Sequence, residues 1–146
     1  MIFSNFTDEA RVWVYQADKI LPKEYEGEIQ QAITEFVAKW AAHGAKLTAT
    51  GAKISDYHIA FCVEGDVAAS GCSIDSSVKF VKSLGEELNI DFFNRLKVLT
   101  EENGNTEIVD YDSLTKYSNR KIYNPLITNL GELRKNWLIS IPEFLS

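Results

Sequence analysis

The residues best suited to chemistry lie between positions 70 and 77, where a thiol, a glycine and several hydroxyls precede an apolar-periodic run. Cys72 is the candidate nucleophile or redox thiol, because the positive end of a helix favours a reactive thiolate. His43 is the candidate general base, and Asp75 is the carboxylate that would orient it. Together these three residues define the hypothesis of a thiol-dependent enzyme or redox protein.

The same stretch also fits an anion-binding or small-ligand site. Unpaired N–H groups at a helix start carry a partial positive charge that attracts anions. Asp75 weakens this hypothesis because it adds a negative charge. Backbone and hydroxyl donors would come from five candidate binding residues, namely Ser70, Gly71, Ser73, Ser76 and Ser77.

A third interpretation of the stretch is structural. Ser73 would cap a helix, with Asp75 in the first turn at the positive end of the helix dipole. Gly71 would supply the freedom of a turn, and Cys72 would be buried as a small apolar group. We expect a non-catalytic interaction module or a small-ligand and anion-binding module, and the thiol-dependent enzyme is the alternative.

Two elements ahead of this stretch are indicated by their hydrophobic patterns. Arg11–Gln16 is rich in β-branched and aromatic residues and predicts a central strand, with Trp13 and Tyr15 on one face. A helix is predicted to open at Leu21–Pro22, where proline suits the first turn. Its apolar stripe runs through Ile29, Ile33, Phe36, Val37, Trp40 and Ala41. Gly44 is placed as the C-cap of this helix, just after His43.

Further strands and helices follow from local patterns. Strands are predicted at Lys46–Thr50, Tyr57–Val63, Leu96–Thr100 and Thr106–Val109. Gly51 and Ser55–Asp56 would supply turns, Asn103–Gly104 is a hairpin signal, and His58 would be a partly exposed sheet residue. Helices are predicted from Ser73 to near Asn89, from Asp112 to Tyr117 and from Asn129 to Trp137, with Ile141–Pro142 stopping any continuation.

This order of elements predicts a single α+β domain over residues 1–146. Its first six elements, strand-helix-strand-strand-helix-strand, match a ferredoxin-like two-layer sandwich in which two helices cover one face of an antiparallel sheet. An added hairpin strand and a C-terminal helical extension would complete the domain.

Composition excludes several classes of function. The formal net charge of −6 has the wrong sign for binding a phosphate backbone, so we expect no nucleic-acid partner. No apolar run is long enough for membrane insertion, and no signal-peptide pattern is apparent, so we expect a cytoplasmic protein. Two cysteines without a CxxC pair, and two histidines, indicate free thiols, no metal and no cofactor. The partner would be an unidentified protein or small molecule.

The common nucleotide, hydrolase and zinc-protease signatures are absent, including GxxxxGK[ST], GxGxxG, GxSxG and HExxH. From position 11 to position 95 the sequence resembles a bacterial family of short proteins filed under the label "ABC transporter ATPase". The matching residues are Arg11–Gln16, Trp40, His43–Gly44, Leu47, Ser70–Ser77, Phe93 and Arg95. The resemblance implies no catalytic residues, and without a phosphate loop it implies at most an accessory role beside a transporter.

Overall fold

Three antiparallel strands form the main sheet of the computed structural model, which describes residues 1–146. β5 (His58–Glu64) lies between β1 (Arg11–Gln16) and β4 (Thr48–Ser55). Residues 59 to 62 of β5 are fully buried. This is the burial expected of a central strand with both faces covered.

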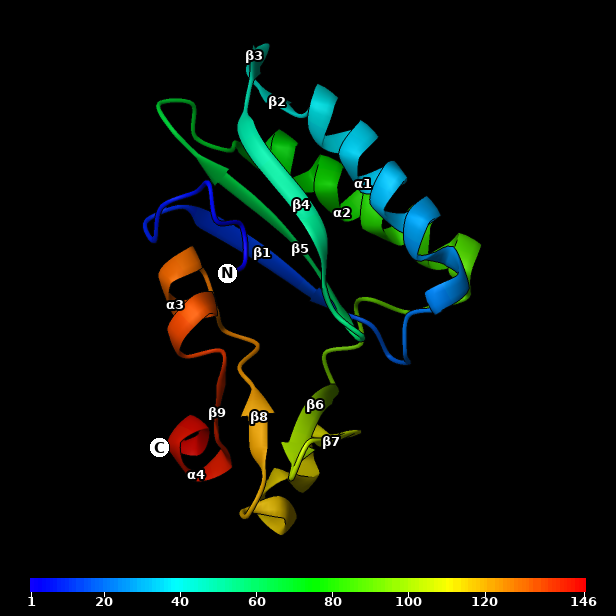
Figure 1. The fold of residues 1–146 in the computed structure, drawn as a ribbon, viewed down its shortest axis with the longest axis vertical. Helices are drawn as coiled ribbons and strands as arrows, with labels where there is room; N and C mark the ends of the chain where they lie inside the picture. Colours follow the sequence, from blue (N-terminus) through cyan, green and yellow to red (C-terminus); the bar gives the residue numbers. More distant parts are fainter.

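The two long helices cover one face of this sheet (Figure 1). α1 (Glu26–Lys39) follows a single 3₁₀ turn (Lys23–Tyr25), and α2 (Gly71–Leu88) follows β5. Trp13 and Tyr15 of β1 pack into the core on this side. The prediction that these two aromatic residues share one face of the strand is therefore confirmed, but β1 lies at the edge of the sheet and not, as predicted, at its centre.

A cluster of aromatic rings fills the space between the helices and the sheet. Phe61 lies at its centre, and its ring centroid is 5.6 to 6.1 Å from those of Phe36, Trp40 and Phe80. Gly51 on β4 leaves room for this ring, because a Cβ atom there would lie 2.9 Å from a ring carbon of Phe61. The predicted turn at Gly51 is thus wrong, and the glycine lies inside a strand because the core needs its space.

The opposite face of the sheet is covered by the first ten residues and by α3 (Leu130–Lys135). Val12 and Cys62 of the sheet pack there against Leu130 and Leu133 of α3. Burial raises the pKa of the Cys62 thiol to about 12, so Cys62 is an inert packing residue.

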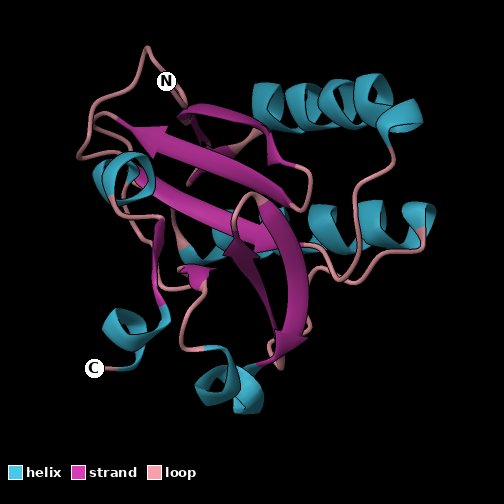
Figure 2. Cartoon of the chain, turned by 60° about the horizontal axis from the view of Figure 1, so that its bottom comes forward, coloured by secondary structure: helices cyan, strands magenta, loops and turns pink.

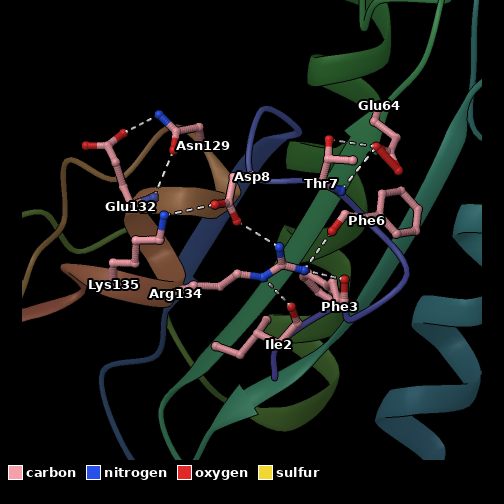
Figure 3. A network of polar contacts seen from close by, with 10 residues as sticks. All are labelled: Ile2, Phe3, Phe6, Thr7, Asp8, Glu64, Asn129, Glu132, Arg134 and Lys135. Atoms are coloured by element: carbon pink, nitrogen blue, oxygen red, sulfur yellow. Dashed lines mark hydrogen bonds and ion pairs between the residues drawn. The ribbon is translucent and has the colours of Figure 1, made fainter.

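Arg134 ties α3 to the first residues of the chain (Figure 3). Its guanidinium donates hydrogen bonds to the backbone carbonyls of Ile2, Phe3 and Phe6 at 2.6 to 3.0 Å. It also pairs with the Asp8 carboxylate at 2.9 Å. The side chain of Arg134 is only 8% exposed. These four oxygens therefore take the place of the water molecules that the guanidinium loses when it is buried.

A second sheet, with the strand order β7-β6-β8-β9, lies below the first in Figure 1. Its strands are β6 (Lys97–Glu102), β7 (Asn105–Asp110), β8 (Lys121–Tyr123) and β9 (Leu138–Ser140). A 3₁₀ segment (Tyr111–Tyr117) and α4 (Ile141–Leu145) pack on this sheet. Figure 2 shows the two long helices together on one side and these short helical segments on the other.

The α+β class is confirmed, but the fourth strand of the ferredoxin-like arrangement is not where we predicted it. In that topology β6 would pair with the outer edge of β1, whereas β6 pairs with β7 and β8. The side chain of Gln16 gives the physical reason. Its Nε2 donates to the Lys97 carbonyl at 3.3 Å and its Oε1 accepts from the Leu99 N–H at 3.0 Å. β6 therefore begins against a side-chain amide instead of the backbone of β1.

The predicted C-cap at Gly44 is also wrong, because α1 ends at Lys39. β2 (Ala41–Ala42) and β3 (Ala45–Lys46) form a small hairpin, and its two turn residues have φ values of 51° at position 43 and 80° at position 44. Trp40 leaves the helix in an extended conformation, and its Nε1 donates to the Ser73 carbonyl at 2.7 Å. Packing of this one indole therefore ends the helix a turn early.

Local signals in the second half of the chain are confirmed in part. Asn103–Gly104 forms the hairpin turn, with both residues at positive φ. Asn129 caps α3, although that helix ends at Lys135 instead of Trp137. Ile141–Pro142 opens α4 instead of stopping a helix, because proline fits a first turn.

His58 is buried and not partly exposed as predicted. It is 2% exposed, and its ring lies 5.4 Å from that of Tyr123 and 4.8 Å from that of Trp137. Its Nδ1 lies 2.6 Å from Ser55 Oγ. Burial lowers the pKa of His58 to about 3, so a neutral imidazole joins the first sheet to the second.

We expect this buried histidine to make the protein less stable as the pH falls below about 6.5. The unfolded chain takes up the proton near pH 6.5, whereas the folded chain resists it until about pH 3. Stability is therefore fully present above pH 6.5 and declines by about 1.4 kcal/mol per pH unit below it. Urea unfolding of His58→Asn should show a shallower decline between pH 6.5 and 5, whereas His43→Gln, at an exposed position, should keep the parent slope. If stability declined equally steeply with falling pH in all three proteins, this result would contradict the assignment of His58 as a buried, neutral imidazole.

Candidate functional site

The hydroxyls of the predicted anion site are already used by α2 itself. Ser70, and not Ser73, is the N-cap: its Oγ accepts from the Ser73 N–H, and Ser73 Oγ in turn accepts from the Ser70 N–H. Ser76 Oγ donates to the Cys72 carbonyl at 2.9 Å, and Ser77 Oγ to the Ile74 carbonyl at 2.7 Å. An anion at this helix start would have to compete with these bonds.

The three candidate catalytic residues form no constellation. Cys72 is exposed, which overturns the prediction that it is buried as a packing group. Asp75 and His43 are also exposed, and Asp75 lies beyond the first turn of α2. No hydrogen bond or ion pair connects any two of them, and His43 lies in the hairpin turn between β2 and β3. Gly71 has no positive φ and is not required by a turn.

A different site lies along the outer edge of β1. A groove of about 600 Å³ there is lined by every residue of Arg11–Gln16. α2 contributes Ile74 and Val78 to it, and Pro125–Thr128 contributes a further wall. We call this site the β1 groove. Its volume lies in the range of pockets that hold small ligands.

The backbone of β1 presents unpaired hydrogen-bonding groups to this groove. Successive residues of an antiparallel strand direct their N–H and C=O groups to opposite edges. The N–H of Val12 points away from β5, because it donates to the Thr128 carbonyl at 3.0 Å. The Val12 carbonyl, both groups of Val14 and the Gln16 N–H therefore point the same way. None of these four groups has a hydrogen-bond partner in the structure.

The two ends of this open edge are closed by contacts of different kinds. At one end the segment at Thr128 lies against the strand, and the Leu130 N–H donates to the Ala10 carbonyl at 2.9 Å. At the other end the side-chain amide of Gln16 is hydrogen-bonded to the backbone of β6. The open length is thus the middle of β1, centred on Val14.

The groove is apolar on both sides of the plane of the sheet. Ile74 and Val78 of α2, with Phe93, lie on the helix side, and Val98 and Ile127 also line the groove. On the rim, Leu126 is 69% exposed and Tyr111 is 42% exposed. These two side chains extend the apolar surface of the groove to its rim.

Tyr15 fixes α2 against β1 at this site. Its hydroxyl lies 3.1 Å from Ser77 Oγ, and its ring lies 5.6 Å from that of Phe93. Desolvation raises the pKa of Tyr15, so its hydroxyl is neutral at physiological pH. The helix wall of the groove is therefore held by a hydrogen bond and by aromatic packing.

In comparisons with protein-family models, with curated proteins and with solved structures, the chain matches none. No helix combines the length and the apolar character needed to cross a bilayer. No group of three or more His, Cys, Asp or Glu side chains is arranged to hold a metal ion.

Sequence reasoning missed the β1 groove although it recognised most of its parts. Arg11–Gln16 was correctly predicted as a strand, but its outer edge was assigned to the wrong partner. Gln16 is the signal that was available: a polar residue ending an apolar strand has a long amide side chain that can bond a neighbouring backbone.

Two substitutions at the start of α2 test the revised cap. Ser70→Ala should lower the free energy of unfolding by about 0.5–2 kcal/mol, because it removes the acceptor of the Ser73 N–H. Gly71→Ala should leave stability unchanged or raise it by up to about 1 kcal/mol, because nothing lies within 4 Å of the added Cβ and the backbone suits any residue. Urea midpoints measure both effects. A loss of stability in Gly71→Ala as large as that in Ser70→Ala would contradict the assignment of Ser70 as the N-cap.

Cys72→Ser should leave stability within about 0.5 kcal/mol of the parent, because exposed side chains without partners contribute little. Cys62→Ser should be clearly destabilising, because it places a hydroxyl in an apolar cluster. Thermal melting at neutral pH compares the pair. A large loss at Cys72 would show that the thiol is packed after all.

Proposed function

We propose that this protein is a non-catalytic interaction module whose β1 groove binds an extended segment of a partner protein. The bound segment adds a strand to the sheet at the outer edge of β1. The observation that carries this proposal is the set of four unpaired backbone groups, from Val12 to Gln16, that face an apolar groove. An exposed strand edge is the surface that accepts an added strand.

The lining of the groove supports an extended chain as the occupant. Side chains of a bound strand alternate between two directions, and apolar residues lie on both sides of the sheet plane here. Each backbone hydrogen bond contributes about 0.5–1.5 kcal/mol, and burial of the alternating side chains adds to it. The bound segment would occupy the position of the fourth strand in a ferredoxin-like sheet.

A flexible segment fits this groove better than the edge of a folded sheet. A strand inside a sheet brings its neighbouring strands with it, whereas α2 and Pro125–Thr128 wall the groove on either side. The resemblance to the bacterial family is compatible with this role, because an accessory partner acts by binding and not by hydrolysing nucleotide.

The test uses a blocked neutral peptide, acetyl-Gln-Val-Thr-Val-Thr-Val-Gln-amide, as the probe. When it is added, amide hydrogen exchange at Val14 and Gln16 should slow, because both N–H groups gain an acceptor. Val14→Pro should abolish binding, because proline removes the outward N–H while leaving the ladder to β5 intact.

The matched control is Ala49→Pro on the opposite edge of the same sheet. The Ala49 N–H points away from β5, since the neighbouring Gly51 carbonyl accepts a hydrogen bond from Gln30 on that side. This variant should bind the probe like the parent. Unchanged exchange at Val14 in the folded parent would overturn the proposal. A concentration-dependent dimer that Val14→Pro dissolves would overturn it in favour of a second copy as the occupant.

A further inference from the structure

We infer that the segment bound in the β1 groove carries an acidic residue at each end of a stretch of about five uncharged residues. This inference rests on the proposed function and specifies the partner's chemistry. The observation behind it is the charge of the groove, which differs in sign from that of the chain as a whole.

Three cations and no carboxylates line the groove. Arg11, Arg95 and Lys97 are its only charged residues, although the chain has 21 Asp and Glu against 15 Lys and Arg. A basic groove in an acidic protein attracts acidic ligands and disfavours basic ones.

Two of these cations lack a carboxylate partner. Neither Arg11 nor Arg95 has one within 4 Å. The other two arginines are both paired, Arg120 with Glu107 and Arg134 with Asp8. Lys97 is neutralised by Asp110, so the available positive charge lies on the two free guanidinium groups.

The two free arginines lie at opposite ends of the open edge. Arg11 begins β1, and its guanidinium is placed 4.6 Å above the Trp13 ring. Arg95 lies two residues before Lys97, whose carbonyl accepts from the Gln16 side chain at the other end. Six residues of strand separate the ends by about 17 Å. Acidic residues that flank five uncharged ones in a strand lie about 20 Å apart, and the long arginine side chains can span the difference of about 3 Å.

Both ion pairs would be partly exposed, since Arg11 and Arg95 are exposed in the free protein. Exposed pairs are weak individually. Two of them together should tighten binding by about tenfold at low salt, and most of this gain should disappear at high ionic strength.

The experiment compares three blocked peptides that share the core Val-Thr-Val-Thr-Val and carry Glu, Gln or Lys at both ends. Dissociation constants come from titrations of the full chain followed by amide chemical shifts, at 50 mM and 500 mM salt. The Glu-flanked peptide should bind about tenfold more tightly than the Gln-flanked one at low salt, and the Lys-flanked peptide should bind more weakly than both.

Three variants test which residues cause the preference for Glu over Gln. Arg11→Gln and Arg95→Gln should each remove part of the preference for Glu over Gln, and together they should abolish it. Lys39→Gln is the matched control, because Lys39 is an exposed, unpaired cation on α1 outside the groove. It should keep the full preference.

The outcomes separate this inference from the proposed function. If all three peptides bind at Val14 with equal affinity, strand addition stands and the acidic specificity is overturned. If none of them slows amide exchange at Val14 or Gln16, the proposed function falls and this inference with it. A preference for Glu that persists in the double arginine variant would place the charge recognition elsewhere and overturn the inference.

Discussion

A β-strand has two hydrogen-bonding edges, and along its middle β1 uses only one. The surrounding elements border this incomplete edge without pairing with its middle. α2 is held against one side of it by the Tyr15 hydroxyl and Ser77, and the segment at Thr128 closes one end through the backbone of Val12. Gln16 closes the other end and directs β6 into a separate sheet.

An open strand edge is normally a hazard, because it invites pairing with any other open edge. Here the exposed length is short, and walls on both sides of the sheet plane restrict what can approach it. Positive charge at the two ends adds a second restriction in a protein whose net charge is −6. The same features that protect the edge from unspecific pairing would select a specific partner.

Elements that depend on local sequence were predictable. Arg11–Gln16 was recognised from its composition, α1 and α2 from their periodic apolar stripes, and the β6–β7 turn from Asn103–Gly104. Each of these signals acts within a few residues, so no knowledge of the rest of the chain was needed. Their boundaries were less predictable, because the packing of a distant group, such as the indole of Trp40 on Ser73, ended α1 early.

The candidate site was predicted in the wrong place for a physical reason. Ser70 to Ser77 combines residue types that can do chemistry, but their hydroxyls serve the helix that contains them. The β1 groove depends instead on contacts between residues such as Gln16 and Leu99, 83 positions apart. His58 shows the same limit, because Tyr123 and Trp137 bury it from the far end of the sequence. Pairings over such separations leave no periodic trace in a single sequence.

The clasp around Arg134 has a consequence for how the protein is made. Asp8 and Arg134 are 126 positions apart, and a ribosome adding 5–20 residues per second needs about 6 to 25 s to cover that interval. Throughout that interval the apolar side chains of Ile2, Phe3 and Phe6 cannot make their final packing contacts. The nascent chain is thus exposed to chaperones and to aggregation until α3 has emerged from the ribosome, and a ribosome stalled before position 134 would display this unfinished face of the sheet.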